Sequence, residues 1–356
     1  MTSSGSPDVV MTYDYSTVAA WAANGYVRPV DAYAKAVGAD GSDYFPIAKD
    51  LVYVNGHFWG LTQAFCFDLF WWNKDIHHGP PPRTIAELDA LAARYTKFDK
   101  KGNLVQVGIV PWAQGSYTDW NTAWGGRFYD RARGKWTINT PQNRRFLEWF
   151  LKYVHLVGGA DKAAALGSTG GMGPGVADPL FYSGRAAFSA ISESYPPLVR
   201  LSAPKLKYGI TQMPTAPGVP YGTFTSVGGN AYLLPTKAPH PREAAIFFKY
   251  IGSREPVLAW NMIDVSFPPY KSDVYSPTYL KTLPTMAPYI AALKLNHMMP
   301  SIPSPHFPLF DSEMSNAIGE VTFKRKTPAQ ALAEVDRKVS AAVQQFKQVH
   351  PNWHTE

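Results

Sequence analysis

Aromatic rings and hydrogen-bonding side chains gather where the expected strands and helices end. The rings are Tyr15, Trp112, Tyr117, Trp124, Tyr195 and Phe310, and the polar groups that accompany them are Asp14, Gln63, Gln114, Glu193 and Asn230. An apolar ring packs against the C–H face of a sugar, while amides and carboxylates bind the hydroxyl groups. Each ring taken alone could instead form the edge of a hydrophobic core. The set as a whole predicts a pocket for a polyhydroxylated ligand.

Two carboxylates leave a catalytic alternative open. Glu193 and Asp68 could form the acid pair of a glycoside hydrolase, although a sequence does not give the distance between them. Other catalytic signatures are missing, because the chain has no GxSxG, GxxxxGK[ST] or HExxH motif. His77 and His78 lack neighbours with metal-ligand spacing, which favours a solvated pair in a loop. We therefore expect no enzyme, no metal site and no cofactor.

The composition is that of a folded protein with about two domains. The chain has 356 residues, of which 46% are hydrophobic and 17% charged. A net charge of +7 could suit a cytoplasmic basic scaffold that binds polyanions, but Lys and Arg are scattered and their densest cluster is only 324–326. We expect no nucleic-acid partner. The single cysteine, Cys66, excludes an internal disulfide, and its apolar surroundings predict a buried, inert thiol.

The stretch from Leu51 to His78 is expected to position much of the pocket. Asn55-Gly56 lies between two short strand patterns and is a strong hairpin signal. Thr62-Gln63-Ala64 then interrupts the apolar pattern with polar groups, and the dense apolar run 67–72 follows. A buried strand with such an interruption indicates a chain that crosses between two bodies, beside something that needs hydrogen bonds. Asp68 would then be a residue of the hinge or of the pocket floor.

The remaining chain alternates between strand and helix patterns. Thr84 and Glu87 form a capping box at the start of one helix. We expect strands at 7–13, 104–110, 208–213 and 231–234, and helices at 18–23, 85–95, 117–124, 243–251 and 328–349. This alternation predicts α/β layers with mostly parallel sheets, which bind ligands beyond the ends of their strands.

Several segments carry a resemblance that covers nearly the whole chain. They are PDVV…WAANGYVRPVDAY, NGHFWGLTQAF…FWWNKD, PPRTIAELDALAARY, FYSGRAAFSAISES…YGITQMP…SVGGNAYLLPTKAPHPREAAIFFKYI and TPAQALAEVDRKV. In this order they resemble the extracellular solute-binding proteins of sugar ABC importers, in the branch of maltose- and glycerol-3-phosphate-binding proteins.

The resemblance implies an α/β, two-lobed periplasmic-binding-protein-like fold of type II. Hinge strands would join the lobes, and closure on the ligand would bring the lobes together. Lobe 1 would comprise 1–68 and 229–285, and lobe 2 would comprise 69–228 and 286–356. The resemblance also implies the residues that face the ligand: Asp14, Tyr15, Gln63, Phe65, Trp112, Gln114, Tyr117, Trp124, Gly126, Glu193, Tyr195, Gly228, Gly229, Asn230, Phe307 and Phe310.

Two departures from the family pattern matter. Family members normally begin with an export signal and a strand–helix–strand unit, whereas this sequence begins at the PDVV strand. We expect either a shortened N-terminus or a first lobe with fewer strands and an exposed sheet edge. Glycerol-phosphate binders carry an arginine near the HFPLF stretch, where this chain has Phe307-Pro308-Leu309-Phe310. A phosphate would lack a bidentate partner there, which favours a neutral carbohydrate or polyol and leaves a glycerol-phosphate-type ligand as the alternative.

The resemblance implies a transport function without chemistry. The protein would be the substrate-binding subunit of an ABC importer, periplasmic or extracellular and membrane-associated, acting as a monomer that delivers its ligand to permease subunits in the membrane. No signal peptide is recognisable at the start of this sequence.

Overall fold

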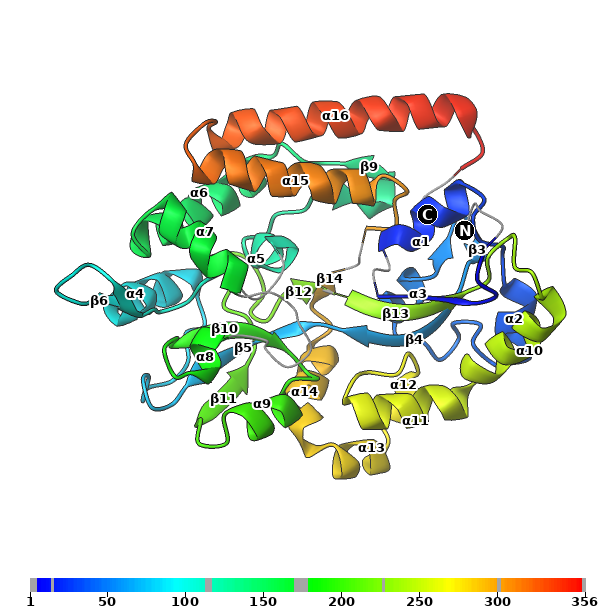
Figure 1. The fold of residues 1–356 in the computed structure, drawn as a ribbon, viewed down its shortest axis with the longest axis horizontal. Helices are drawn as coiled ribbons and strands as arrows, with labels where there is room; N and C mark the ends of the chain where they lie inside the picture. The colour runs from blue at the N-terminus through cyan, green and yellow to red at the C-terminus, as the bar shows by residue number, and fades with distance from the viewer. Residues whose placement is uncertain are drawn as a thin grey trace.

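The computed structural model describes residues 5–13, 16–112, 117–169, 179–225, 228–299 and 302–353. Two three-stranded sheets lie beside each other, and each is covered by its own helices (Figure 1). We call the sheet that contains β1 with its helices the first lobe, and the sheet that contains β5 with its helices the second lobe. The two-lobed α/β expectation is confirmed.

The first lobe is built on strands that come from distant parts of the sequence. Its sheet has the order β1 (Val10–Thr12), β13 (Gly228–Leu233) and β4 (Leu61–Cys66). A single hydrophobic cluster fills the space between this sheet and its helices. These helices are α1 (Ser16–Ala23), α2 (Asp31–Ala36), α3 (Pro46–Asp50), α10 (Pro241–Ile251), α11 (Arg254–Asp264), α12 (Lys271–Val274), α13 (Pro277–Thr282), η2 (Pro284–Met286) and α14 (Ala287–Leu295). Helix α14 thus packs on the first lobe, beyond the expected domain boundary at residue 285.

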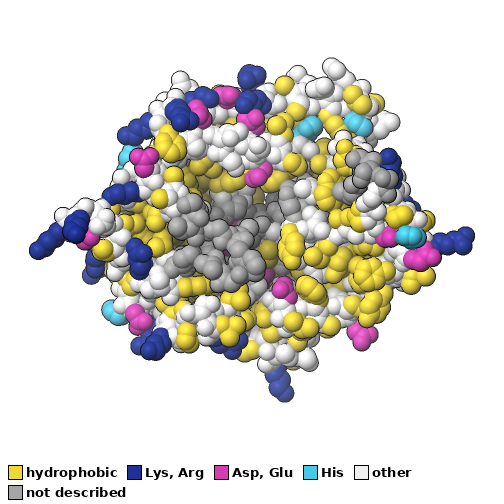
Figure 2. All heavy atoms as spheres, in the orientation of Figure 1, with side chains coloured by type: hydrophobic (Ala, Val, Ile, Leu, Met, Phe, Trp, Pro, Cys, Tyr) yellow, Lys and Arg dark blue, Asp and Glu magenta, His cyan; other side chains and the backbone are white. Residues whose placement is uncertain are grey.

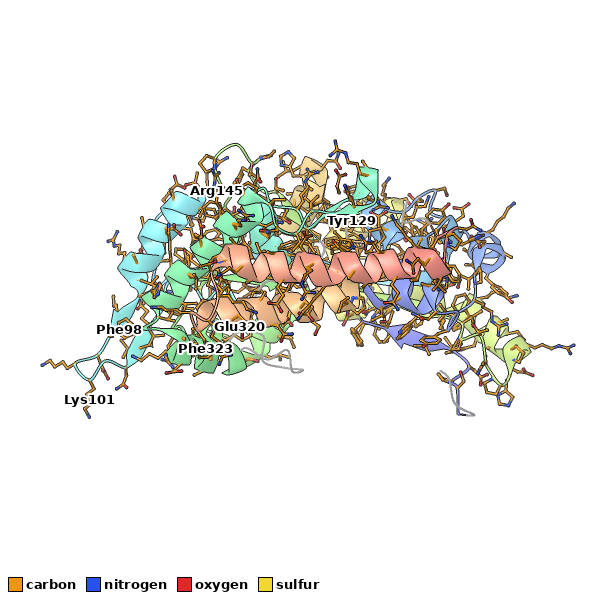
Figure 3. All side chains as sticks on the ribbon, turned by 90° about the horizontal axis from the view of Figure 1, so that it is seen from above. Phe98, Lys101, Tyr129, Arg145, Glu320 and Phe323 are labelled. Carbon is orange, nitrogen blue, oxygen red and sulfur yellow. The ribbon has the colours of Figure 1, made fainter. Side chains whose placement is uncertain are left out.

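The second lobe has the sheet order β10 (Phe188–Ser192), β5 (Asp68–Asn73) and β11 (Tyr208–Thr211). Its helices are α4 (Ile85–Tyr95), α5 (Tyr117–Ala123), α6 (Pro141–Leu156), α7 (Ala160–Thr169), α8 (Pro179–Tyr182), α9 (Pro196–Ser202), α15 (Phe307–Thr322) and α16 (Pro328–Val349). Helices α15 and α16 pack side by side along one side of the molecule (Figures 1 and 3). Short hairpins complete the lobe: β6 (Lys97–Phe98) with β7 (Leu104–Gln106), and β8 (Tyr129–Asp130) with β9 (Lys135–Trp136) around η1 (Arg131–Arg133).

The expectation of mostly parallel sheets is wrong for the described strands. In both three-stranded sheets every pair of neighbours is antiparallel. The central strands β13 and β5 explain this, because each enters its sheet at a crossing between the lobes and runs against both of its neighbours. Only the short pair β12 (Phe224–Thr225) and β14 (Met298–Met299) is parallel among the named strands.

Local signals in the sequence are confirmed where they rest on turns and caps. Asn55 and Gly56 have positive φ angles of 53° and 77° and connect β2 (Tyr53–Val54) to β3 (His57–Phe58) as a two-residue hairpin loop. Thr84 and Glu87 form the expected capping box at α4. The last helix spans 328–349 as expected, and Thr327 with Gln330 caps it in the same way.

The first crossing between the lobes is the single residue Phe67, between β4 and β5. Its ring is fully buried and stacks on Phe267 of the first lobe at 5.4 Å and on Phe224 at 4.5 Å. The other two crossings pass through β12 and β14, which pair with each other. A short, close-packed set of crossings is the geometry of a hinge.

Strand β1 forms one edge of the first-lobe sheet in the part of the chain that the structure describes. Strand β1 pairs with β13 on one side and with no described strand on the other. On the same lobe, α10 and α11 expose large apolar side chains: Ile246, Phe247, Tyr250, Trp260 and Ile263. Figure 2 shows hydrophobic side chains gathered over this part of the first lobe.

No described helix is both long enough and apolar enough to cross a membrane.

Candidate functional site

The first crossing brings together residues that are far apart in the sequence. In the ladder between β4 and β13, Gly228 lies opposite Cys66 and Gly229 opposite Phe65. In the second lobe, Ser192 lies opposite Asp68. We call the surroundings of this crossing, from Cys66 to Asp68 with Ser192, Glu193 and Gly228, the junction. Antiparallel pairing on both sides of Phe67 therefore places the expected residues of β4, β13 and the end of β10 at one point between the lobes.

Glu193 connects the second lobe to the crossing residue. Its carboxyl group is fully buried, and Oε2 accepts hydrogen bonds from the Phe67 backbone N–H at 3.3 Å and from Ser192 Oγ at 2.9 Å. The other oxygen, Oε1, has no hydrogen-bond partner among the described residues. Burial raises the pKa of Glu193 to about 8, because a charge is poorly solvated there. The group is therefore mostly a neutral acid at neutral pH.

Other acidic groups surround Glu193. Burial raises the pKa of Asp68 to about 7. Cys66 is partly exposed, which differs from the expected buried thiol. Desolvation, followed by the nearby Glu193 and Asp68, raises the pKa of its thiol. Burial, followed by the charge of Asp68, also raises the pKa of the Tyr195 phenol. Each of these groups binds a proton more readily than in water, because negative charge is poorly solvated at the junction. The junction therefore also disfavours a bound anion.

Gln63 is the second unsatisfied polar group near the site. It is the extra residue of a bulge in β4, where the pairing with β13 shifts between Asn230 and Ala231. The side chain is fully buried, and in the described part of the chain neither its amide nitrogen nor its amide oxygen has a hydrogen-bond partner. Leaving such a group unpaired costs about 1–3 kcal/mol, so a partner that completes its hydrogen bonds would be bound favourably.

An aromatic cavity lies in the second lobe. It has a volume of about 330 Å³ and is lined by Pro111, Trp112, Tyr117, Trp120, Phe146, Phe150, Ser315 and Ile318. Two of the expected residues thus face one cavity. Trp112 donates its indole N–H to the Ala163 carbonyl at 2.9 Å, and Tyr117 donates its hydroxyl to Asp311 Oδ1 at 2.8 Å. These bonds fix both rings at the cavity wall.

Several expected residues have buried side chains that serve packing. Phe65 stacks on Phe267 at 5.3 Å, and Phe310 packs against Trp136 at 4.8 Å, both fully buried. Phe307 is partly buried beside Phe310. Trp124 lies against Trp149.

Two expected glycines lie where the backbone packs closely. A Cβ at Gly126 would come within 2.3 Å of Asn121 Oδ1, and one at Gly229 within 2.5 Å of a Leu51 methyl group. Only glycine fits at these positions without displacement of a neighbour.

The remaining predictions concern residues that the structure does not describe or that it places outside this site. Asp14, Tyr15 and Gln114 lie outside the described residues. The prediction that His77 is solvated is wrong, because its side chain is buried. Its Nδ1 lies 3.0 Å from the Tyr95 hydroxyl and its Nε2 lies 2.7 Å from the Pro80 carbonyl. Among the described residues no cluster of His, Cys, Asp and Glu is suited to hold a metal ion.

The sequence interpretation missed the contribution of α15 to the aromatic cavity. Asp311, Ser315 and Ile318 follow one another at helical spacing of four and three residues. This spacing places them on one face of the helix, next to Phe310. A helical reading of the segment after HFPLF could have identified that face.

Comparisons with known proteins identify a matching family and similar structures. The sequence model of the family described as bacterial extracellular solute-binding protein matches residues 1–257. A curated relative, an uncharacterised ABC transporter extracellular-binding protein of Pyrococcus horikoshii, is 27% identical over 254 residues, which is 66% of this chain and 53% of the relative. The chain therefore spans about half the length of this curated relative.

Solved structures share the fold over almost all of the chain. The protein named CpMnBP1 with mannobiose bound has a TM-score of 0.82 at 24% identity, covering 94% of this chain and 84% of that chain. A solute-binding protein of Agrobacterium radiobacter K84 in complex with ribitol has a TM-score of 0.71 at 22% identity, with 94% and 84% covered.

Proposed function

This chain belongs to the family of bacterial extracellular solute-binding proteins, and we propose that it captures a carbohydrate or polyol between its two lobes and delivers it to the permease of an ABC importer. The protein would act outside the cytoplasm, as a monomer, with the ligand and the membrane permease as its partners and without binding nucleic acid. The similar proteins named above are bound to mannobiose and to ribitol, which supports this class of ligand.

The observation that carries the proposal is the junction itself. The first crossing is one residue long, and the unsatisfied oxygen of Glu193 and the unsatisfied amide of Gln63 lie on elements that meet there. Hydroxyl groups both donate and accept hydrogen bonds, so a sugar or polyol could supply the missing hydrogen-bond partners of Glu193 and Gln63. A ligand that contacts groups of both lobes favours the closed arrangement of the hinge, because its binding free energy is larger there.

The buried acids of the junction support a neutral ligand. Glu193 and Asp68 are both buried there, and burial raises the pKa of each carboxyl group. The same burial would disfavour the charge of a phosphate or carboxylate on the ligand. We therefore keep the neutral sugar or polyol ahead of a glycerol-phosphate-type ligand.

We propose different roles for the expected site residues. Gln63, Glu193, Tyr195 and Asn230 would contact the ligand at the junction, and Trp112 and Tyr117 would contact it from the second lobe. Asp14, Tyr15 and Gln114 are proposed as further contacts, and Gly126, Gly228 and Gly229 would keep the backbone close to it. Phe65, Trp124, Phe307 and Phe310 would hold these surfaces in place by packing. The domain division remains part of the proposal, with α14 assigned to the first lobe.

Titration calorimetry with mannobiose, maltotriose and ribitol tests the proposal, combined with chromatography of each mixture after prolonged incubation. We expect saturable one-to-one binding of at least one compound and no new product. A hydrolysis product that disappears in both Glu193→Gln and Asp68→Asn would favour the glycoside hydrolase. Binding of glycerol 3-phosphate alone would contradict the neutral ligand.

A further inference from the structure

A second cavity lies away from the junction and shares no residue with the proposed ligand contacts. Its volume is about 450 Å³, within the range of small-molecule pockets. Three segments line it: the β8–β9 hairpin, residues 304–306, and the end of α16 with the tail that follows. Tyr129 of the hairpin is labelled in Figure 3, on the opposite side of α16 from Glu320.

Aromatic rings form two walls of this cavity. On the hairpin, Tyr129 and Trp136 pack edge to face at 5.3 Å. On the other wall, Phe346 of α16 lies 5.1 Å from His306 and 6.2 Å from Trp353. Each wall is held by its own ring contacts, so the space between the walls suits a flat or ring-shaped molecule, which would stack on aromatic faces.

The polar groups of the cavity are mainly donors. Arg133 and Lys347 are the charged residues of the lining, which contains no Asp or Glu. The Arg133 side chain is 80% exposed and lies 3.5 Å from Asp130, whereas Lys347 has no ion-pair partner among the described residues. The buried indole N–H of Trp353 has no hydrogen-bond acceptor within the part of the chain that the structure describes. A ligand that supplies acceptors and negative charge would satisfy these groups.

Both lobes hold the cavity walls in place. The hairpin connects to the first lobe because Arg131 makes a two-pronged ion pair with Asp50 of α3, one bond of which measures 2.7 Å. The tail connects to the same lobe because the Trp353 ring lies 6.1 Å from the Trp59 ring. The walls are thus positioned before any ligand arrives, which lowers the entropy cost of binding.

We propose that this cavity is a second binding site, for a small ring compound that carries a carboxylate or a phosphate. The ring would lie between Trp136 and Phe346, and its anionic group would reach Lys347 and Arg133. This site would take an anion, whereas the proposed carbohydrate site would take a neutral ligand. The ring could be a sugar or an aromatic ring, and the anionic group a carboxylate or a phosphate. The experiment separates these cases.

Titration calorimetry and tryptophan fluorescence with D-glucuronate, D-glucose 6-phosphate, benzoate and neutral D-glucose test this site in the wild type saturated with mannobiose. If mannobiose does not bind, the same titrations are made on the protein alone. We expect saturable one-to-one binding of at least one anion and none of glucose at this site. Lys347→Ala is expected to weaken the binding of the anion by about fivefold, which is the effect of losing one partly screened charge.

Arg337→Ala provides the matched control, because it removes the same charge from an exposed position of the same helix, outside the cavity lining. Equal weakening by Lys347→Ala and Arg337→Ala would show diffuse attraction to a basic surface and overturn the proposal. Absence of binding by all three anions, or displacement of the anion by mannobiose, would overturn it as well. Failure of mannobiose to bind leaves this test intact, so the two sites are judged separately.

Discussion

Replacing Glu193 with glutamine removes an ionisable group from the junction while keeping its size. The glutamine oxygen can still accept the hydrogen bond from the Phe67 backbone N–H, so the packing of the crossing is preserved. In the wild type, burial raises the pKa of Glu193 from its ordinary value of 4.5 to about 8. The folded protein therefore binds this proton more tightly than the unfolded chain does.

The sign of the pH dependence follows from that difference. Between the two pKa values the folded state holds a proton that the unfolded state has lost, so the contribution to stability is fully present below the unfolded pKa and is lost as pH rises towards 8. Each pH unit in this window costs about 1.4 kcal/mol, so the wild type loses up to about 4 kcal/mol of unfolding free energy between about pH 5 and pH 8. Glu193→Gln lacks this loss and is expected to be the more stable protein at pH 8.

Urea unfolding followed by tryptophan fluorescence at several pH values measures the slope directly. The matched control is Glu148→Gln, which removes an exposed carboxyl group from α6 and is expected to keep the wild-type slope. Parallel pH profiles of wild type and Glu193→Gln would refute the reasoning, because they would mean that this carboxyl group ionises as it does in water.

Three further predictions concern single side chains. Trp112→Ala and Tyr195→Ala are each expected to weaken carbohydrate binding by about 1–3 kcal/mol in calorimetry, as for a lost stacking contact; unchanged affinity in both would remove them from the site. Gln63→Leu is expected to raise the unfolding free energy by about 1 kcal/mol, because it deletes a buried amide without partners, and to weaken the ligand. A loss of stability with full affinity would contradict this. Thr84→Ala breaks the capping box of α4 and is expected to cost about 1 kcal/mol in thermal or urea unfolding without changing affinity; a change in affinity would show that α4 is coupled to the site.

Local chemistry made much of the fold predictable. The hairpin at Asn55-Gly56 and the capped helix that starts after Thr84 depend on backbone preferences of a few neighbouring residues, and the structure confirms both. Strand direction depends on where a distant segment enters a sheet, and a period-two pattern is the same for parallel and antiparallel strands. The sequence pattern of β13 or β5 therefore does not predict that each strand runs antiparallel to its neighbours.

The candidate site is likewise predictable from the sequence only in part. The polar interruption at Gln63 was visible in the sequence because it breaks an apolar run, and the structure gives it a physical form as a buried bulge residue. Burial of His77 was not foreseen, since its partners are the Tyr95 hydroxyl and the Pro80 carbonyl, and spacing alone does not show these contacts. The raised pKa of Glu193 likewise depends on desolvation by residues from several segments.

The apolar side chains that α10 and α11 expose have a consequence for the behaviour of the protein in solution. Exposed apolar surfaces of different molecules attract one another. The charge of +7 opposes this attraction, because molecules of the same sign repel at long range. Salt screens the repulsion but not the short-range contacts. The purified protein is therefore expected to be colloidally stable in dilute buffer and to form larger particles, visible by dynamic light scattering, as ionic strength increases.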